Sequence, residues 1–177
     1  LVTAALCDAR TSVEELALGE AHGTGTALGD PIEAGSLVAA VLLARRTPLA
    51  VGGVKANIGH AEPAAGMTGL LKLALGLQRC EASANAQLRS LNPHVGSTLR
   101  EVACALQVQT AVLVRASLAG GVSSFGYSGT IAHAVLRTSA SDERAPHCEA
   151  LLEFRRLEFL WRDAPHPFAQ RRVATSD

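Results

Sequence analysis

Short apolar runs alternate with stretches of helical spacing along the first part of the chain. The runs at residues 16–20 and 49–53 predict buried strands, and each is followed by a glycine-rich turn. Stretches with helical periodicity come after these turns, at residues 30–44 and 63–78. This order of strand, helix, strand and helix is typical of an α/β domain.

The two predicted helices are indicated by different sequence features. In the first, Asp30 is a suitable cap, Pro31 suits the first helical position, and residues 34–44 continue with an apolar surface expected to be largely buried. The second has a set of apolar side chains at helical spacing that we expect to face the core. They are Met67, Leu70, Leu71, Ala74 and Leu77.

The pattern is less regular after the second helix. Residues 91–94 (LNPH) predict a loop, and residues 105–109 and 111–118 are candidate strands. Residues 120–130 form a third glycine-rich segment, which we interpret as a loop, and residues 131–136 resume as a strand. The whole predicts an α/β half-domain with mixed strand pairing.

Composition narrows the class of protein. With 48% hydrophobic residues the 177-residue chain has ample material for a core, and its net charge of zero without a long basic run argues against nucleic acid as a main partner. No apolar stretch reaches the roughly 18 residues that span a bilayer. The four cysteines lack metal-ligand spacing and are expected to be reduced, mostly small core residues. These are Cys7, Cys80, Cys104 and Cys148.

The chain changes character near residue 137. Residues 138–145 are polar and are expected to form a linker. The remainder holds four of the six aromatic residues, whereas a disordered tail is expected to be poor in aromatics. We therefore expect the tail to pack on its own domain or on a neighbouring one.

Two histidines carry the most suggestive chemistry. His22 and His60 each lie in a glycine-rich turn after a predicted strand, and Lys55, Asp30 and Glu33 are close to them in sequence. Such a set can hold two neutral imidazoles as N–H donors toward a developing oxyanion. Lys55 is one of only two lysines among 16 basic residues, which favours a need for its compact charge.

Other interpretations of these residues remain open. A lone histidine is more often structural than catalytic, and His22, His60 and Asp30 could instead form a two-histidine, one-carboxylate metal site. Residues 23–29 resemble a phosphate-binding turn but lack its glycine-lysine-serine/threonine ending. No cysteine lies in a small-residue turn before an amphipathic helix, so a candidate nucleophile is missing.

Three motifs together resemble the three C-terminal motifs of β-ketoacyl synthases, most closely those of the ketosynthase domains of modular type I polyketide synthases. The first comprises residues 20–26 (EAHGTGT) and 29–34 (GDPIEA), the second residues 54–60 (VKANIGH) and the third residues 123–130 (SSFGYSGT). The resemblance covers residues 1–136 and implies the C-terminal half of a thiolase-like fold, a mixed sheet with helices on both faces. It assigns residues 1–137 to that half-domain and residues 138–177 to a post-ketosynthase linker that packs back on the domain.

The resemblance also implies an activity, decarboxylative Claisen condensation of an acyl thioester with a malonyl-type acyl carrier protein. His22 and His60 match the two histidines that bind the malonyl thioester carbonyl and stabilise the enolate. Lys55 matches the lysine that organises charge, with Glu33 or Asp30 as its acidic partner.

The third motif matches the loop that gates the pocket, at Phe125, Gly126 and Tyr127, and the Tyr127 amide matches an oxyanion-hole donor. Tyr127 replaces the usual phenylalanine, Ile131 replaces a common asparagine, and residues 62–63 (EP) vary the segment after the second histidine. The family's N-terminal half, which holds the cysteine nucleophile, is absent. We therefore expect a fragment that is inactive in condensation by itself.

The resemblance implies partners as well. Substrates would arrive on the phosphopantetheine of an acyl carrier protein, with no cofactor or metal bound directly by the chain. We expect neighbouring polyketide synthase domains, a homodimer at full length and a cytoplasmic location, with no nucleic acid or membrane as partner. The alternative is a non-catalytic ketosynthase-like module that binds carrier protein or serves assembly geometry.

Overall fold

Four of the five strands in the main sheet run parallel, and the fifth runs antiparallel at one edge. The computed structural model describes residues 1–86, 88–114 and 118–138. The strand order is β4-β2-β1-β6-β7, with only β6 and β7 antiparallel. The strands are β1 (Leu16–Glu20), β2 (Leu49–Gly52), β4 (Cys104–Leu106), β6 (Ala119–Phe125) and β7 (Ile131–Arg137). The expected mixed pairing is confirmed.

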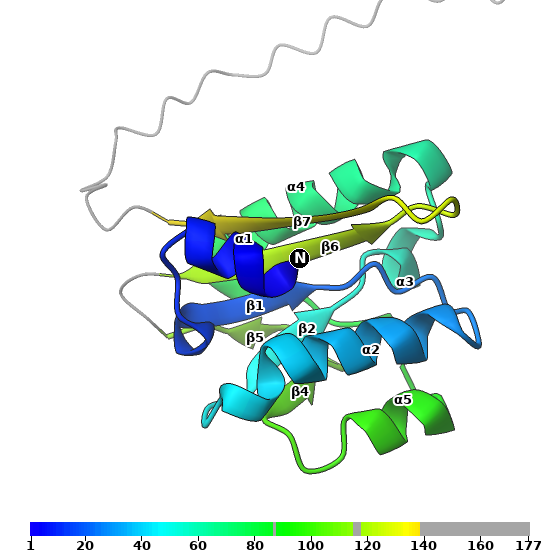
Figure 1. Ribbon diagram of the computed structural model, residues 1–177, viewed down its shortest axis with the longest axis horizontal. Coiled ribbons are helices and arrows are strands. Elements are labelled where there is room, and N and C mark those ends of the chain that lie inside the picture. The colour runs from blue at the N-terminus through cyan, green and yellow to red at the C-terminus, as the bar shows by residue number, and fades with distance from the viewer. Residues whose placement is uncertain (87, 115–117, 139–177) are drawn as a thin grey trace, which may run out of the picture. The chain divides into compact units, whose positions relative to one another are not determined.

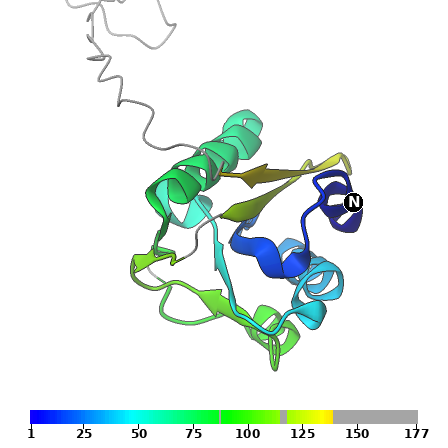
Figure 2. The same ribbon diagram turned by 90° about the vertical axis from the view of Figure 1, so that its left-hand side faces the viewer.

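Helices lie on both faces of this sheet (Figures 1 and 2). One face is covered by α4 (Ala65–Arg79), which contacts β1 and β6, and the other by α1 (Val2–Asp8) and α2 (Gly29–Ala40). The shorter helical elements are α3 (Lys55–Ile58), α5 (Pro93–Thr98), η1 (Val13–Glu15), η2 (Leu42–Ala44) and η3 (Glu62–Ala64). A separate two-stranded ladder joins β3 (Glu81–Ala82) to β5 (Ala111–Val112).

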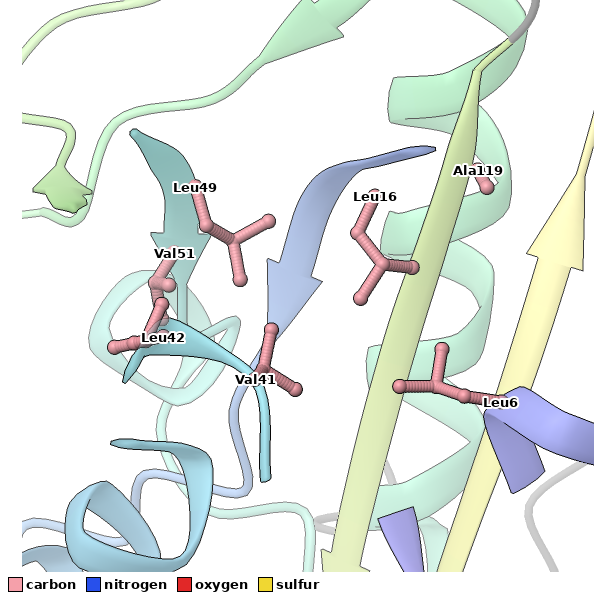
Figure 3. Close-up of a cluster of buried hydrophobic side chains, with 7 residues drawn as sticks. All are labelled: Leu6, Leu16, Val41, Leu42, Leu49, Val51 and Ala119. Atoms are coloured by element: carbon pink, nitrogen blue, oxygen red, sulfur yellow. The ribbon is translucent and has the colours of Figure 1, made fainter. Parts of the chain in front are cut away.

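Each face of the sheet has its own apolar cluster. The cluster on the α1 and α2 side includes Leu6, Leu16, Leu42 and Leu49 (Figure 3). The cluster on the α4 side includes Leu18, Leu73, Leu77, Leu118 and Val122. Together they hold the sheet between its two helical layers, and burial of this apolar surface is the main stabilising contribution.

An irregularity in β1 determines which side chains face which layer. The pairing of β1 with β6 shifts between Leu16 and Leu18, where one residue is extra in β1. An extra residue reverses the alternation of faces. Leu16 therefore belongs to the cluster beneath α1 and α2, whereas Leu18 packs with α4.

Both helix predictions need correction. Of residues 34–44, Ala34, Val41 and Leu42 are buried, but Leu43 is 71% exposed and the others are exposed or half-buried, so the expectation of a largely buried surface is wrong. The helix also ends at Ala40, and its N-cap is Leu28 rather than Asp30. The buried face of α4 consists of Ala65, Gly69, Leu73 and Leu77, whereas the predicted core residues Met67 and Leu71 are more than half exposed.

Several later elements also differ from expectation. The segment interpreted as a glycine-rich loop starts as strand β6, and the predicted loop at residues 91–94 contains the first turn of α5. Asn92 caps α5 by accepting from His94 N at 2.9 Å, with Pro93 at the first helical position. The candidate strands at residues 105–109 and 111–118 correspond to β4 and β5, and both are shorter than predicted.

The cysteine prediction is wrong in part. Cys7 is exposed, while Cys80 and Cys104 are partly buried, and all three are free thiols. Cys148 and the aromatic tail lie outside the described residues, so the domain boundary and the packing of the linker stay predictions. Within the described ranges, no helix combines the length and apolar character needed to cross a bilayer.

Candidate functional site

Three strand ends bring the candidate residues together at one edge of the sheet. Strands β1, β2 and β6 are parallel, so their carboxyl ends meet there, and neighbours on both sides make β1 the point where the strand order reverses. Open α/β sheets bind ligands at such a point. His22 follows β1, His60 follows β2, and Phe125 ends β6. The ring centroid of His22 lies 5.7 Å from those of both His60 and Phe125.

The turn that carries His22 is fixed by a carboxylate from α2. Glu33 Oε1 accepts from the backbone N–H of His22 at 2.6 Å, and Oε2 accepts from that of Gly23 at 2.8 Å. Burial raises the pKa of Glu33, and the two backbone bonds oppose that effect. Glu33 therefore holds the polypeptide at His22 and leaves the imidazole itself free for other contacts.

The His22 ring is oriented by Lys55. Lys55 Nζ lies 3.4 Å from His22 Nδ1, and an ammonium group can only donate a hydrogen bond. Nδ1 is then the acceptor, so the proton of the neutral ring is on Nε2. Burial lowers the pKa of His22, and the positive charge of Lys55 lowers it further, which favours this neutral form.

His60 reaches the same protonation pattern by a different contact. Its side chain is exposed, and its Nδ1 accepts from the backbone N–H of Glu62 at 3.1 Å. Glu62 has a φ of 43° and Gly59 a φ of 80°, so the chain turns sharply on both sides of the histidine. A left-handed conformation at a non-glycine residue is costly and is often found at functional sites.

The two imidazoles can therefore act as a pair of neutral donors. Their planes meet at 89° and each Nδ1 is engaged as an acceptor, which leaves an Nε2–H on each ring. Two such donors can stabilise negative charge that develops on one oxygen.

The expected acidic partner of Lys55 is not in direct contact with it. Among the described residues, ion pairs join Lys72 to Glu20 and Arg137 to Glu15, and Lys55 makes none. Burial lowers the pKa of Lys55, while the negative charges of Glu33, Glu20 and Asp30, in that order, oppose the effect. These carboxylates act on Lys55 through space.

Asp30 does not approach the histidines as a ligand would. Its Oδ1 accepts from Gly25 N at 3.1 Å and so closes the loop between His22 and α2. Among the described residues no three histidine, cysteine or acidic side chains are grouped so that they could hold a metal ion.

The third motif contributes one residue to the site and turns another away from it. Phe125 packs beside His22 with the two ring planes tilted by 46°. Gly126 N donates to Thr130 O at 2.6 Å and closes the turn between β6 and β7. The Tyr127 side chain at the tip of this turn is fully exposed.

A cavity of about 380 Å³ lies beneath α2 and borders the site, because Gly23, Glu33 and Phe125 are among its lining residues. Its walls include Leu37 of α2, Val51 of β2 and Val95 of α5, whereas His22, Lys55 and His60 are not among its lining residues. The imidazole pair therefore lies outside this cavity.

Sequence reasoning missed a second charged pair at the same edge. Glu20 is 4% exposed, and its Oε2 lies 2.5 Å from Lys72 Nζ on α4. Two signals were available, since a carboxylate that ends a buried strand needs a partner and Lys72 is the only other lysine. A second missed contact is Ser123 Oγ to His133 Nδ1, at 2.9 Å.

Comparison with known proteins identifies the family of this chain. Residues 1–89 match the family model described as the C-terminal domain of β-ketoacyl synthase. The chain is 38% identical over 130 residues to erythronolide synthase EryA2 of Saccharopolyspora erythraea. It is 39% identical over 149 residues to a phenolphthiocerol/phthiocerol polyketide synthase subunit of Mycobacterium tuberculosis. These matches cover 73% and 82% of this chain but only 4% and 8% of the relatives.

Solved structures give the same result at the level of the fold. A ketosynthase domain of the oxazolomycin system of Streptomyces albus is 37% identical, with a TM-score of 0.72 over 78% of this chain. The ketosynthase from module 1 of the bacillaene synthase of Bacillus amyloliquefaciens is 31% identical, also with a TM-score of 0.72 over 78% of this chain. The chain spans 25% and 26% of those two structures. The expected half of a thiolase-like fold is confirmed, and the chain belongs to the β-ketoacyl synthase family, matching its C-terminal domain.

Proposed function

We propose that this chain supplies the two-histidine part of a polyketide-type β-ketoacyl synthase, which performs decarboxylative Claisen condensation. The observation that carries the proposal is that a donor lies at the Nδ1 atom of both His22 and His60. A Lys55 ammonium and a Glu62 amide occupy the two Nδ1 atoms and leave two Nε2–H donors. Decarboxylation of a malonyl thioester needs such donors, because its barrier lies in charge that appears on the thioester oxygen.

The reaction then proceeds in two balanced steps. The bond between the carboxylate and the α-carbon breaks, carbon dioxide leaves, and the electron pair forms an enolate whose oxygen accepts from the two imidazoles. The enolate carbon next attacks the carbonyl of an acyl thioester, which forms the new carbon–carbon bond and a tetrahedral oxyanion. Collapse of this intermediate re-forms the carbonyl, breaks the carbon–sulfur bond and expels a thiolate. The cysteine that carries this acyl group would come from outside these 177 residues.

Lys55 maintains the protonation state that these steps require. Its positive charge disfavours a second positive charge on His22, and burial acts in the same direction. The imidazole thus remains a neutral donor. An imidazolium would bind the carboxylate of the substrate as well as the developing oxyanion, which would favour the ground state.

The proposed partners follow from the same chemistry. A malonyl-type substrate would be delivered on the phosphopantetheine arm of an acyl carrier protein, and neighbouring polyketide synthase domains would provide the acyl group. We further propose a homodimeric synthase of which this chain is a part, and a cytoplasmic location. The chain by itself would not catalyse condensation.

The test measures release of carbon dioxide from malonyl carrier protein by the intact synthase domain that contains this chain. His22→Ala and His60→Ala are each expected to slow decarboxylation by about a hundredfold or more, as for the loss of one oxyanion donor. His94→Ala is the matched control, since His94 is exposed on α5. Equal losses in all three variants would refute the donor role. Full carrier-protein binding without decarboxylation by the wild type would instead identify a non-catalytic module.

A further inference from the structure

We propose that the buried ion pair between Glu20 and Lys72 is a positioning device that fixes Lys55 against His22. The pair lies outside the donor set described above and connects three elements at the edge of the sheet, β1, α4 and the segment before α3. The contacts of the pair are structural observations that do not depend on the proposed function. Their catalytic meaning rests on the proposed function, because it concerns the lysine that keeps His22 neutral.

Both oxygens of Glu20 are engaged. Oε2 receives Lys72 Nζ at 2.5 Å, and Oε1 accepts from the backbone N–H of Val54 at 2.6 Å. The Glu20 side chain is 3% exposed and that of Lys72 is 19% exposed, so the pair is largely shielded from water. A shielded carboxylate with two charge-assisted or backbone contacts has a well-defined position.

The irregularity in β1 directs Glu20 toward α4. Leu18 packs with Leu73 and Leu77 of α4, and Glu20 follows two residues later on the same face of the strand. If β1 alternated regularly from Leu16, Glu20 would instead lie on the side of α1 and α2. The irregularity therefore lets Glu20, at the end of β1, contact Lys72 of α4.

Gly52 leaves space for the pair. A Cβ atom there would lie 2.6 Å from Lys72 Nζ, closer than real Cβ contacts allow. At Gly69 of α4 a Cβ would make only ordinary contact with Glu20 Cγ, at 3.4 Å. The end of β2 thus accommodates the lysine side chain. The pair occupies a packed position, not a chance surface contact.

The pair acts on Lys55 through the backbone. Val54, whose amide Glu20 holds, directly precedes Lys55 and is 8% exposed. Asn85 Oδ1 accepts from Gly53 N at 2.9 Å, so two successive amides before Lys55 are bound by side chains. This fixed backbone leads into α3, which begins at Lys55. The Lys55 ammonium nitrogen lies 3.4 Å from His22 Nδ1.

A titration of Lys55 tests this role directly in the 177-residue chain. Lys55 and Lys72 are the only lysines, so isotope-labelled lysine gives two side-chain NMR signals, and Lys72→Met leaves one. The charged groups around Lys55 are Glu33 and Asp30 of the α2 segment, Glu20 of β1 and, when protonated, His22. The variants change only the net charge of the Glu20 and Lys72 pair, and the other charged groups stay the same.

The two single variants have opposite expected signs. Glu20→Gln removes a negative charge, so the Lys55 midpoint moves to lower pH, by roughly half a pH unit. Lys72→Met removes a positive charge from the same cluster, so the midpoint moves to higher pH by a similar amount. Arg137→Met breaks the exposed ion pair with Glu15 and is the matched control, with no expected movement. Shifts of the same sign, or none beyond the control, would overturn the proposal.

The variant Glu20→Leu/Lys72→Met keeps the test decisive if a single unpaired charge unfolds the chain. It leaves no buried charge but removes the acceptor for Val54 N–H, so that amide is expected to exchange roughly tenfold faster. The Lys55 signal should then lose its response to His22→Asn. An unchanged response, or unfolding of all three variants, would overturn the positioning role. Failure of decarboxylation in the intact synthase would refute the proposed function alone, because the titration does not depend on activity.

Discussion

The carboxylate of Glu33 binds the main chain at His22, with Oε1 2.6 Å from the His22 amide nitrogen and Oε2 2.8 Å from that of Gly23. One side chain of α2 thereby satisfies two consecutive amides in the turn after β1. The turn that carries His22 and the acidic segment that follows it are thus one structural unit. The spacing of 11 residues between His22 and Glu33 is what allows α2 to return its first turn to the end of the strand.

Glu33→Gln is expected to destabilise this turn. The glutamine amide keeps one acceptor but places an NH₂ group against a backbone N–H, which leaves a partly buried donor without a partner. The expected loss is about 1–3 kcal/mol in the free energy of unfolding. Asp30→Asn is the matched control, because Asp30 accepts a single bond from the exposed Gly25 amide. Urea denaturation measures both, and an equal effect would contradict the special position of Glu33.

Lys55→Arg is expected to impair decarboxylation although it conserves the charge. The Lys55 ammonium is partly buried and lies 3.4 Å from His22 Nδ1, whereas a guanidinium is larger, planar and needs a different approach. The turnover rate of the intact synthase should fall while binding of the carrier protein is retained. Full turnover in this variant would show that Lys55 is only a solvated surface residue.

The strands and turns around the histidines were predictable because their signal is local. An apolar run of five residues before a glycine-rich turn marks β1, and the same pattern marks β2. The parallel pairing of these strands then brings the two turns to one edge, so sequence alone could associate His22 with His60. The resemblance to ketosynthases rested on these same turns.

The misassigned elements depended on contacts that are distant in sequence. Gly120 and Gly121 suggested a loop, but they lie in β6, which pairs with β1 and β7. Close packing favours glycine at both positions, since a Cβ would meet Leu73 Cδ1 at 2.6 Å or His133 Nε2 at 2.9 Å. In α4, apolar residues occur on two sides, so periodicity could not tell which side the sheet covers. Glu20 and Lys72 are 52 residues apart, and no local pattern connects them.

The pH dependence of stability should reveal His133. Burial lowers the pKa of His133, so the unfolded chain binds more protons below about pH 6.5. Its contribution to stability is therefore present above that pH and is lost as the pH falls through the folded-state pKa. Denaturation midpoints of the wild type should decline between pH 7 and pH 5, and His133→Asn should make that decline shallower. His94→Asn, at an exposed position, should follow the wild-type curve, and a His133→Asn curve parallel to the wild type would contradict the assignment.

Gly121→Ala and Gly35→Ala are expected to change stability in opposite directions. A Cβ at Gly121 would lie 2.9 Å from His133 Nε2 and 3.0 Å from Cε1, so the ring must move and its contact with Ser123 is lost. Overpacking of this kind costs about 1–3 kcal/mol. At Gly35, inside α2, a Cβ would meet nothing within 4 Å, and alanine should stabilise the helix by roughly 0.5–1 kcal/mol. Urea denaturation measures both effects. The cost of Gly121→Ala should also shrink in a His133→Ala background, because the blocking ring is gone, and an undiminished cost there would show that the strand backbone, not the imidazole, requires glycine.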